Sequence, residues 1–239
     1  MTQTVLITGA SRGLGLGLVK TFLSHGFRVI ATCRNPDHAP DLCQALKTAN
    51  QSPPVALDVS SDESVESLRK YLTSLNLTVD HLINNAGISN KDHPVEDPDK
   101  IDRKEMLEIF NTNVAGVAKV TEACGVLRAD NTAGKVLNIS SGLGSISRTI
   151  KSGGFNAVSY RCSKAAQNML TACFALKFPQ VTFVMINPGW VKTDMGGSAG
   201  RTADISVEES VAGIYQVFNN LTPANTGTFL DWKGEELPF

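Results

Sequence analysis

The sequence predicts an α/β fold: an open, doubly wound parallel sheet flanked by helices on both faces. Short apolar or β-branched runs alternate with helical stretches along most of the chain, and this alternation is typical of parallel sheets. Several runs are apolar at consecutive positions, as expected of strands that are covered on both faces. The predicted strands are residues 5–8, 28–32, 55–57, 81–83, 135–140 and 181–186.

The predicted flanking helices come from apolar residues that recur at intervals of three and four. They cover residues 14–23, 65–75, 104–127 and 159–178. The polar stretch 89–103 contains two prolines and predicts a surface loop. Because 239 residues suffice for one large α/β domain, we expect residues 1–239 to form a single domain.

Composition excludes several classes of protein. A hydrophobic content of 42% and a net charge of -1 indicate a globular chain with no basic face for nucleic acid. The five cysteines and four histidines have no metal-ligand spacing, so we expect reduced thiols and no metal site. No signal-type run or membrane-spanning stretch is present, and these features predict a cytoplasmic protein without a membrane partner.

The first predicted strand ends in a glycine-rich turn, T-G-A-S-R-G-L-G, which leads directly into a helix. Such a turn lets the backbone approach a pyrophosphate, and the N-terminus of the following helix favours anionic oxygens. The spacing G-x-x-x-G-x-G differs from the common G-x-G-x-x-G fingerprint. The alternative is a simple helix cap after a buried strand. The predicted dinucleotide-binding residues of this Rossmann-type turn are Gly9, Ser11, Arg12, Gly13, Leu14 and Gly15.

Charge at the end of the second strand predicts which nucleotide binds. That strand ends in Arg34, where an acidic residue would instead accept ribose hydroxyls. Arg12 in the glycine turn offers a second guanidinium for a 2′-phosphate. The two arginines favour NADPH over NADH, whereas the alternative is that both are ordinary surface charges.

Tyr160 and Lys164 are four residues apart on a predicted helix, so their side chains lie on one face. A phenol is a poor acid near neutral pH, but a neighbouring ammonium favours the phenolate and lowers its pKa toward the working range. The pair alone is a weak pattern, since surface Tyr and Lys residues often have this spacing.

Further short motifs follow in order along the chain. They are D-V at residues 58–59, N-N-A-G at 84–87, N-T-N-V-A-G with Asn113, N-I-S-S-G with Ser141, and P-G at 188–189. With the glycine turn and the Tyr-Lys pair, this ordered set resembles the short-chain dehydrogenase/reductase family from Val5 to about Met195.

The resemblance implies a catalytic role for four residues. Tyr160 would exchange the proton, Ser141 would bind the substrate oxygen, Lys164 would bind ribose hydroxyls, and Asn113 would anchor a water. Asn84 to Gly87 would support the nucleotide. The resemblance also implies cofactor contacts by Asp58, Val59, Asn85, Ala86, Gly87, Tyr160, Lys164, Pro188, Gly189, Val191 and Thr193.

Ser141 is preferred to Ser140 because the family places its serine second in the I-S-S pair. The stretch between Ser141 and Tyr160 is longer than usual in the family, with R-T-I-K-S-G-G as the insertion, and Ser140 stays open. The chain also resembles the sniffer-type carbonyl reductases and their C-factor-like relatives. The resemblance lies in this loop and in two further segments, A-T-C-R-N-P and P-G-W-V-K-T-D-M-G-G.

The implied reaction is NADPH-dependent reduction of an aldehyde, ketone or quinone to an alcohol. Phe155, Trp190 and Met195 are candidate pocket walls, because ligands bind at the carboxyl ends of such strands. Two alternatives stay open: an NADP(H)-binding signalling or sensor protein, and an NAD-dependent alcohol dehydrogenase. The resemblance also implies a homodimer, because related enzymes pair the helices that begin here at Lys104 and Ser159. These helices carry the small residues Ala115, Gly116, Ala165 and Ala166, and the alternative is core packing within one subunit.

Overall fold

A seven-stranded, fully parallel sheet forms the centre of the chain in the computed structural model, which describes residues 2–90, 96–154, 156–197 and 203–239. The strand order is β3-β2-β1-β4-β5-β6-β7. The strands are β1 (Thr4–Ile7), β2 (Arg28–Cys33), β3 (Val55–Ala56), β4 (His81–Asn84), β5 (Lys135–Ile139), β6 (Thr182–Asn187) and β7 (Phe229–Asp231).

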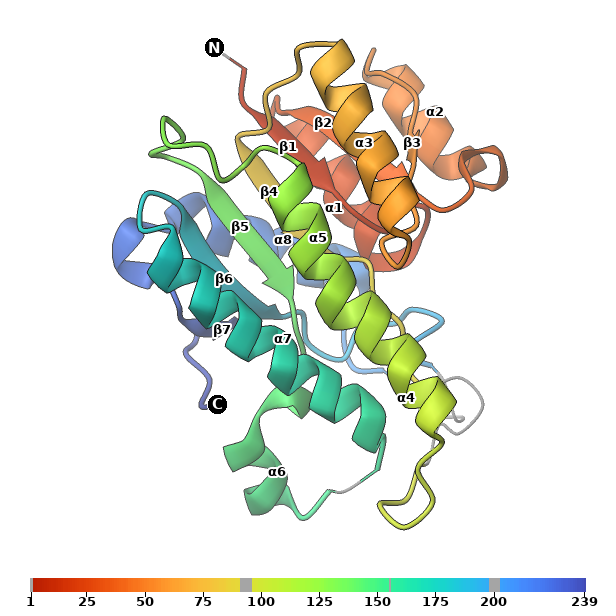
Figure 1. The fold of residues 1–239 in the computed structure, drawn as a ribbon, viewed down its shortest axis with the longest axis vertical. Helices are drawn as coiled ribbons and strands as arrows, with labels where there is room; N and C mark the ends of the chain where they lie inside the picture. Colours follow the sequence, from red (N-terminus) through yellow and green to blue (C-terminus); the bar gives the residue numbers. More distant parts are fainter. Residues whose placement is uncertain (1, 91–95, 155, 198–202) are drawn as a thin grey trace.

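Helices cover both faces of this sheet. In Figure 1, α3, α5 and α7 lie over the face turned to the viewer, and α1 and α8 lie behind it. The α-helices are α1 (Gly13–Ser24), α2 (Pro40–Thr48), α3 (Asp62–Ser74), α4 (Arg103–Phe110), α5 (Gly116–Ala123), α6 (Ile146–Ser152), α7 (Val158–Lys177) and α8 (Val207–Asn220). Shorter turns are η1 (Pro36–His38), η2 (Asn111–Ala115), η3 (Gly142–Gly144) and η5 (Pro223–Asn225).

The central strand β1 shows why consecutive apolar residues predict this arrangement. Val5 and Ile7 belong to the core beneath α1 and α8, whereas Leu6 belongs to the core beneath α3 and α5. Successive side chains of a strand point to opposite faces, so each of the three is fully buried. The predicted doubly wound fold and its six strands are confirmed, with strand ends that differ by at most one residue.

Several features differ from the predicted elements, and the helices α2 and α8 were not predicted at all. The single helix predicted over residues 104–127 is interrupted by a π-helical turn, η2, which carries Asn113. The lengthened loop after Ser141 contains a short helix, α6. The seventh strand, β7, was not predicted, because three residues are too few for a periodic signal.

The strand order reverses between β1 and β4, which places a crevice at their carboxyl ends. From β1 the chain builds outward to β2 and β3, and it then returns to β4 on the other side. Ligands of open α/β sheets bind in the crevice at such a switch point.

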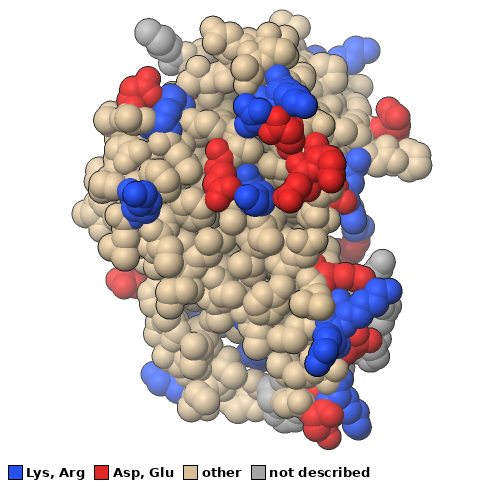
Figure 2. All heavy atoms as spheres, viewed as in Figure 1, with Lys and Arg blue, Asp and Glu red and all other residues tan. Residues whose placement is uncertain are grey.

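Oppositely charged side chains alternate on the face covered by α3, α5 and α7 (Figure 2). The pairs Arg69–Glu66 and Lys119–Glu122 lie on α3 and α5. Exposed pairs of this kind add little stability, and their opposite charges largely cancel at a distance.

The structure also bears on the expectations about cysteines, metal ligands, membrane-spanning helices and the dimer. All five cysteines are free thiols, as predicted. Within the described ranges, no group of three or more His, Cys, Asp or Glu side chains is arranged to hold a metal ion. No helix in the same part of the chain is both long and apolar enough to cross a membrane. Gly116, one of the small residues behind the predicted dimer, packs closely against Val59 of the same subunit.

His81 makes the stability of the fold depend on pH. It is 2% exposed, accepts a hydrogen bond from the backbone of Lys135 at 3.2 Å and packs edge-on against Phe218. Burial lowers its pKa to about 4. The unfolded chain, with a histidine pKa of about 6.5, therefore binds a proton between these two values that the folded chain does not bind.

We expect the free energy of unfolding to fall as the pH is lowered from about 6.5 to about 4, with His81 contributing about 2–3 kcal/mol to that loss. His81→Asn retains an acceptor and does not titrate, so its stability should fall less over this range. Urea unfolding at several pH values measures the difference. His38→Asn, at an exposed position, is the control, and parallel pH profiles for His81→Asn and wild type would contradict the assignment.

Candidate active site

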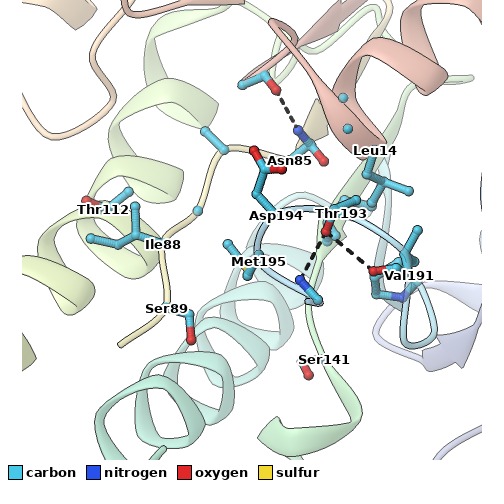
Figure 3. A pocket seen from close by; sticks show the side chains of 18 of the residues that line it. Leu14, Asn85, Ile88, Ser89, Thr112, Ser141, Val191, Thr193, Asp194 and Met195 are labelled. Atoms are coloured by element: carbon cyan, nitrogen blue, oxygen red, sulfur yellow. Dashed lines mark hydrogen bonds between the residues drawn. The ribbon is translucent and has the colours of Figure 1, made fainter. Parts of the chain in front are cut away.

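A pocket of about 610 Å³ opens at the carboxyl ends of the strands, at the switch point between β1 and β4. In Figure 3, Ile88 and Ser89 lie on one side of it and Val191 and Thr193 on the other. The predicted site residues that line it are Gly9, Ser11, Arg12, Gly13, Leu14, Gly15, Arg34, Asp58, Val59, Asn85, Ala86, Gly87, Ser141, Tyr160, Lys164, Pro188, Gly189, Trp190, Val191, Thr193 and Met195.

The glycine turn forms one end of the pocket. Gly9 and Gly13 have φ values of +65° and +53°, which side chains rarely adopt. A Cβ atom at Gly15 would lie 2.2 Å from the carbonyl oxygen of Gly9, so only glycine fits there. Helix α1 begins at Gly13 without a side-chain cap. Its first N–H groups are therefore available to an anion in the pocket.

The loop after β4 is tied directly to this turn. The side chain of Asn85 donates to the carbonyl oxygens of Thr8 (2.9 Å) and Gly9 (3.0 Å). The Thr8 hydroxyl accepts from the backbone N–H groups of Asn85 (3.1 Å) and Ala86 (3.0 Å). These bonds hold the end of β1 and the end of β4 in one rigid wall.

Asn84 does not belong to that wall, contrary to the prediction that residues 84–87 together support the nucleotide. Its side chain points into the protein and donates to Thr121 (3.0 Å) and Asn138 (2.8 Å). The two adjacent asparagines of the N-N-A-G motif therefore serve different purposes, because neighbouring residues at the end of a strand point in opposite directions.

Four charged side chains border the glycine-turn end of the pocket. Arg34 is exposed at the end of β2 and contributes to the lowered pKa of Asp58, which is caused mainly by hydrogen bonds from Ser60. Arg12 pairs with Asp194 across the pocket mouth, and both side chains are exposed. A phosphate contact by Arg12 would compete with that ion pair, whereas Arg34 forms no such pair among the described residues.

Tyr160, Ser141 and Lys164 meet at the other end of the pocket. The Lys164 ammonium lies 5.7 Å from the centre of the Tyr160 ring. Burial raises the pKa of Tyr160 to about 12, and a side-chain hydrogen bond with Ser141 opposes that rise. Burial lowers the pKa of Lys164 to about 7. The i, i+4 spacing on α7 therefore brings the phenol and the amine together, as predicted.

The geometry distinguishes the two neighbouring serines. The Ser140 hydroxyl is buried and donates to the side chain of Asn168 at 2.6 Å. The Ser141 hydroxyl instead caps the η3 turn by accepting from the backbone of Leu143 at 3.1 Å, and it faces Tyr160. Ser141 is therefore the one whose hydroxyl is placed beside the phenol.

Asn113 lies behind the pocket wall and is fully buried in the π-helical turn η2. Its side chain accepts from the backbone N–H of Ile88 (2.9 Å) and donates to the carbonyl oxygen of the same residue (2.8 Å). It also donates to Ser163 of α7 at 3.0 Å. Asn113 therefore fastens the loop after β4 to the helix that carries Tyr160.

Glu96 is a buried residue behind the site that caps the helix carrying Tyr160, and the sequence did not reveal this role. Helix α7 begins after Ala157, which has a φ of +55° and provides no side-chain cap. Glu96 is 2% exposed and accepts from the backbone N–H (2.7 Å) and the hydroxyl (2.8 Å) of Ser159. A carboxylate at a helix N-terminus is stabilised by the helix dipole. Its partner is 63 residues away, so no local pattern predicts this cap.

Apolar side chains form the outer part of the pocket. Trp190 donates through its indole to the carbonyl oxygen of Gly196 at 2.8 Å and is 41% exposed. Met195 and Leu143 also line the opening. Two of the three predicted wall residues thus border the pocket, and the third, Phe155, lies outside the described residues.

The doubly wound sheet with a pocket at its switch point defines a Rossmann-type α/β protein. A family model described as short chain dehydrogenase matches residues 3–204, and the chain belongs to this family of oxidoreductases. The family predicted from the motifs is therefore confirmed.

Three relatives match most of this chain. The NADPH-bound carbonyl reductase from chicken fatty liver has a TM-score of 0.88 and 34% identity, covering 100% of this chain and 99% of that chain. The carbonyl reductase Sniffer of D. melanogaster has a TM-score of 0.89 and 29% identity over 100% of both chains. C-signal of Myxococcus xanthus is 34% identical over 163 residues, which cover 67% of this chain and 93% of that relative.

We expect Glu96→Ala to lower the free energy of unfolding by about 2–4 kcal/mol, because two hydrogen bonds from Ser159 to a buried carboxylate are lost. Urea unfolding measures the change. Glu108→Ala, at an exposed position on α4, should stay within about 0.5 kcal/mol of wild type. A similar small change for Glu96→Ala would show that the cap does not stabilise α7.

Proposed function

We propose that the chain reduces the carbonyl group of a small molecule to an alcohol with NADPH, with Tyr160 as the proton donor. The observation that carries this proposal is one pocket with the glycine turn at one end and Tyr160, Ser141 and Lys164 at the other. We further propose that residues 1–239 form one NADP(H)-binding domain.

The pocket suits a dinucleotide. The uncapped N-terminus of α1 and the close approach at Gly15 leave backbone N–H groups for a pyrophosphate. Arg34 would contact a 2′-phosphate at the far end, and Lys164 would bind ribose hydroxyls near the reacting centre. When bound, NADPH supplies the hydride. Val191, Thr193, Pro188 and Gly189 line the wall beside that centre.

The protein's own contribution is to orient the carbonyl and provide a proton. The Tyr160 hydroxyl would donate its proton to the substrate oxygen, and the Ser141 hydroxyl would hydrogen-bond the same oxygen as negative charge develops on it. The Lys164 nitrogen lies 5.7 Å from the centre of the Tyr160 ring, and its positive charge would favour the phenolate that donation leaves behind. Asn113 holds the loop at Ile88 in place. We also propose that Asn113 anchors a water that replenishes the proton.

The similarity to C-signal favours a second candidate, a nucleotide-binding signalling protein with little turnover. Tight NADPH binding without oxidation by any aldehyde, ketone or quinone would support it. The third reading, an NAD-dependent alcohol dehydrogenase, requires stronger binding of NADH than of NADPH. The homodimer stays a prediction, and a sedimentation mass equal to one chain would contradict it.

We expect Tyr160→Phe to lower kcat for carbonyl reduction by about 10²–10⁴-fold, because the proton donor is removed. NADPH oxidation with a panel of aldehydes, ketones and quinones measures the change, and the Kd for NADPH should stay within about three-fold of wild type. Tyr71→Phe, on α3, is the matched control. Equal activity of Tyr160→Phe and wild type would overturn the mechanism.

We expect Arg34→Asp to weaken NADPH binding by about 10–100-fold, because a charge-assisted contact with the 2′-phosphate is replaced by repulsion. NADH binding should be unchanged or stronger. Fluorescence titration with both nucleotides measures the two affinities. Arg28→Asp makes the same charge change at the opposite end of β2 and should affect neither. An equal loss for both nucleotides in Arg34→Asp would exclude the 2′-phosphate contact.

A further inference from the structure

Gln167 is a fully buried polar residue in direct contact with Lys164. It lies on α7 one turn after Lys164 and is 0% exposed. Its side-chain oxygen accepts a hydrogen bond from the Lys164 ammonium at 2.9 Å. Its side-chain nitrogen, although buried, has no hydrogen-bond partner among the described residues.

A half-satisfied amide in the core is destabilising, because a buried donor without a partner loses its hydration and gains nothing in return. An apolar side chain of similar size would avoid this loss. The side chain's one hydrogen bond goes to Lys164. The hydrogen bond between the Gln167 oxygen and Lys164 therefore offsets the cost of burying the amide. We expect the function of Gln167 to lie in its effect on Lys164.

The ammonium geometry gives that oxygen a specific effect. An ammonium group has three N–H donors. Two of them bind the carbonyl oxygen of Ile139 (2.7 Å) and Gln167 (2.9 Å) inside the protein. Lys164 also lines the pocket, and its nitrogen lies 5.7 Å from the centre of the Tyr160 ring. One N–H is left for the pocket.

Among the described residues, the other groups that the structure places around the ammonium are neutral. Helix α7 contributes Tyr160, the titratable side chain that the structure places against it. Strand β5 contributes a backbone carbonyl, the loop after β4 contributes Gly87, and η3 packs on Lys164 through Gly144. The Gln167 oxygen is therefore one of two neutral acceptors that stabilise the charged form.

We propose that Gln167 is a positioning residue: with the Ile139 carbonyl it holds the Lys164 ammonium at the pocket wall, charged and with one N–H directed to the pocket. The inference rests on the proposed proton donation by Tyr160, since that step requires the positive charge of Lys164. Without the Gln167 oxygen, the buried ammonium would lose its proton at lower pH.

Two substitutions test this proposal in opposite directions. Gln167→Met keeps the length of the side chain and removes the acceptor, so Lys164 should titrate about one pH unit lower. Gln167→Glu adds a negative charge, so Lys164 should titrate at higher pH. Thr171→Val, one turn further along α7 in the same buried polar chain, does not touch Lys164 and should leave its titration unchanged.

The titration is followed by NMR of protein labelled with ¹³C at the lysine ε-carbons, with the Lys164 signal assigned from its absence in Lys164→Arg. This readout needs no substrate. Opposite shifts in the Met and Glu variants support the proposal even if no carbonyl compound is reduced, in which case the proposed function alone fails. Unchanged or parallel titrations overturn it. If the Glu variant does not fold, the direction of the shift in Gln167→Met decides.

The activity profile gives the second readout. For Gln167→Met, NADPH-dependent reduction at pH 8 should fall about ten-fold relative to wild type, and at pH 6 it should stay within about two-fold. For Gln167→Glu, the alkaline decline should move to higher pH. A merely structural role would change the unfolding temperature and scale activity equally at both pH values, and that result would overturn the proposal.

Discussion

The close contact between the turn after β1 and the loop after β4 determines the geometry of the pocket. It depends on two positions without a Cβ atom. A Cβ at Gly9 would lie 2.8 Å from the Cα of Ala86, and one at Gly15 would lie 2.6 Å from the side-chain nitrogen of Asn85. With those positions open, Thr8 and Asn85 form hydrogen bonds across the gap. The open N-terminus of α1 then lies beside the end of β4.

Hydrogen bonds extend this wall to the helix that carries Tyr160. Asn113 binds both backbone groups of Ile88 and also reaches Ser163 on α7. Glu96, further along the same connection, caps the first turn of α7 at Ser159. Helix α7 is thus held at its start and along one side by residues that follow β4. The distance between the glycine turn and Tyr160 is set by buried polar contacts, whose loss would leave unpaired groups.

Sequence reasoning succeeds here where the signal is local. Consecutive apolar residues in β1 predict its burial on both faces, and the four-residue spacing of Tyr160 and Lys164 places both side chains on one side of α7. The π-helical turn at Asn113 was not predicted, because its residues continue the helical pattern on either side. The short helix α6 was not predicted either, because its residues resemble those of the surrounding loop.

Contacts between distant residues explain most of what the sequence does not reveal. The Glu96 cap joins residues 63 positions apart. Asn84 and Asn85 are indistinguishable in the sequence, but in the structure only Asn85 faces the glycine turn. Gln167 follows Lys164 by three residues, yet the sequence alone presents it as an ordinary helix residue. Its hydrogen bond becomes meaningful only once burial and the missing partner of its side-chain nitrogen are known.

Burial shifts the pKa values of the two central ionisable groups in opposite directions. It raises the pKa of Tyr160 to about 12 and lowers that of Lys164 to about 7. In both cases the neutral form is favoured, because a charge is costly away from water. Near neutral pH the phenol is therefore protonated and able to donate, as reduction of a carbonyl requires. Donation leaves a phenolate on Tyr160, which forms readily only while Lys164 keeps its charge. The step therefore needs both a protonated phenol and an ammonium, and the Ile139 and Gln167 oxygens bound to Lys164 oppose the deprotonation that burial favours.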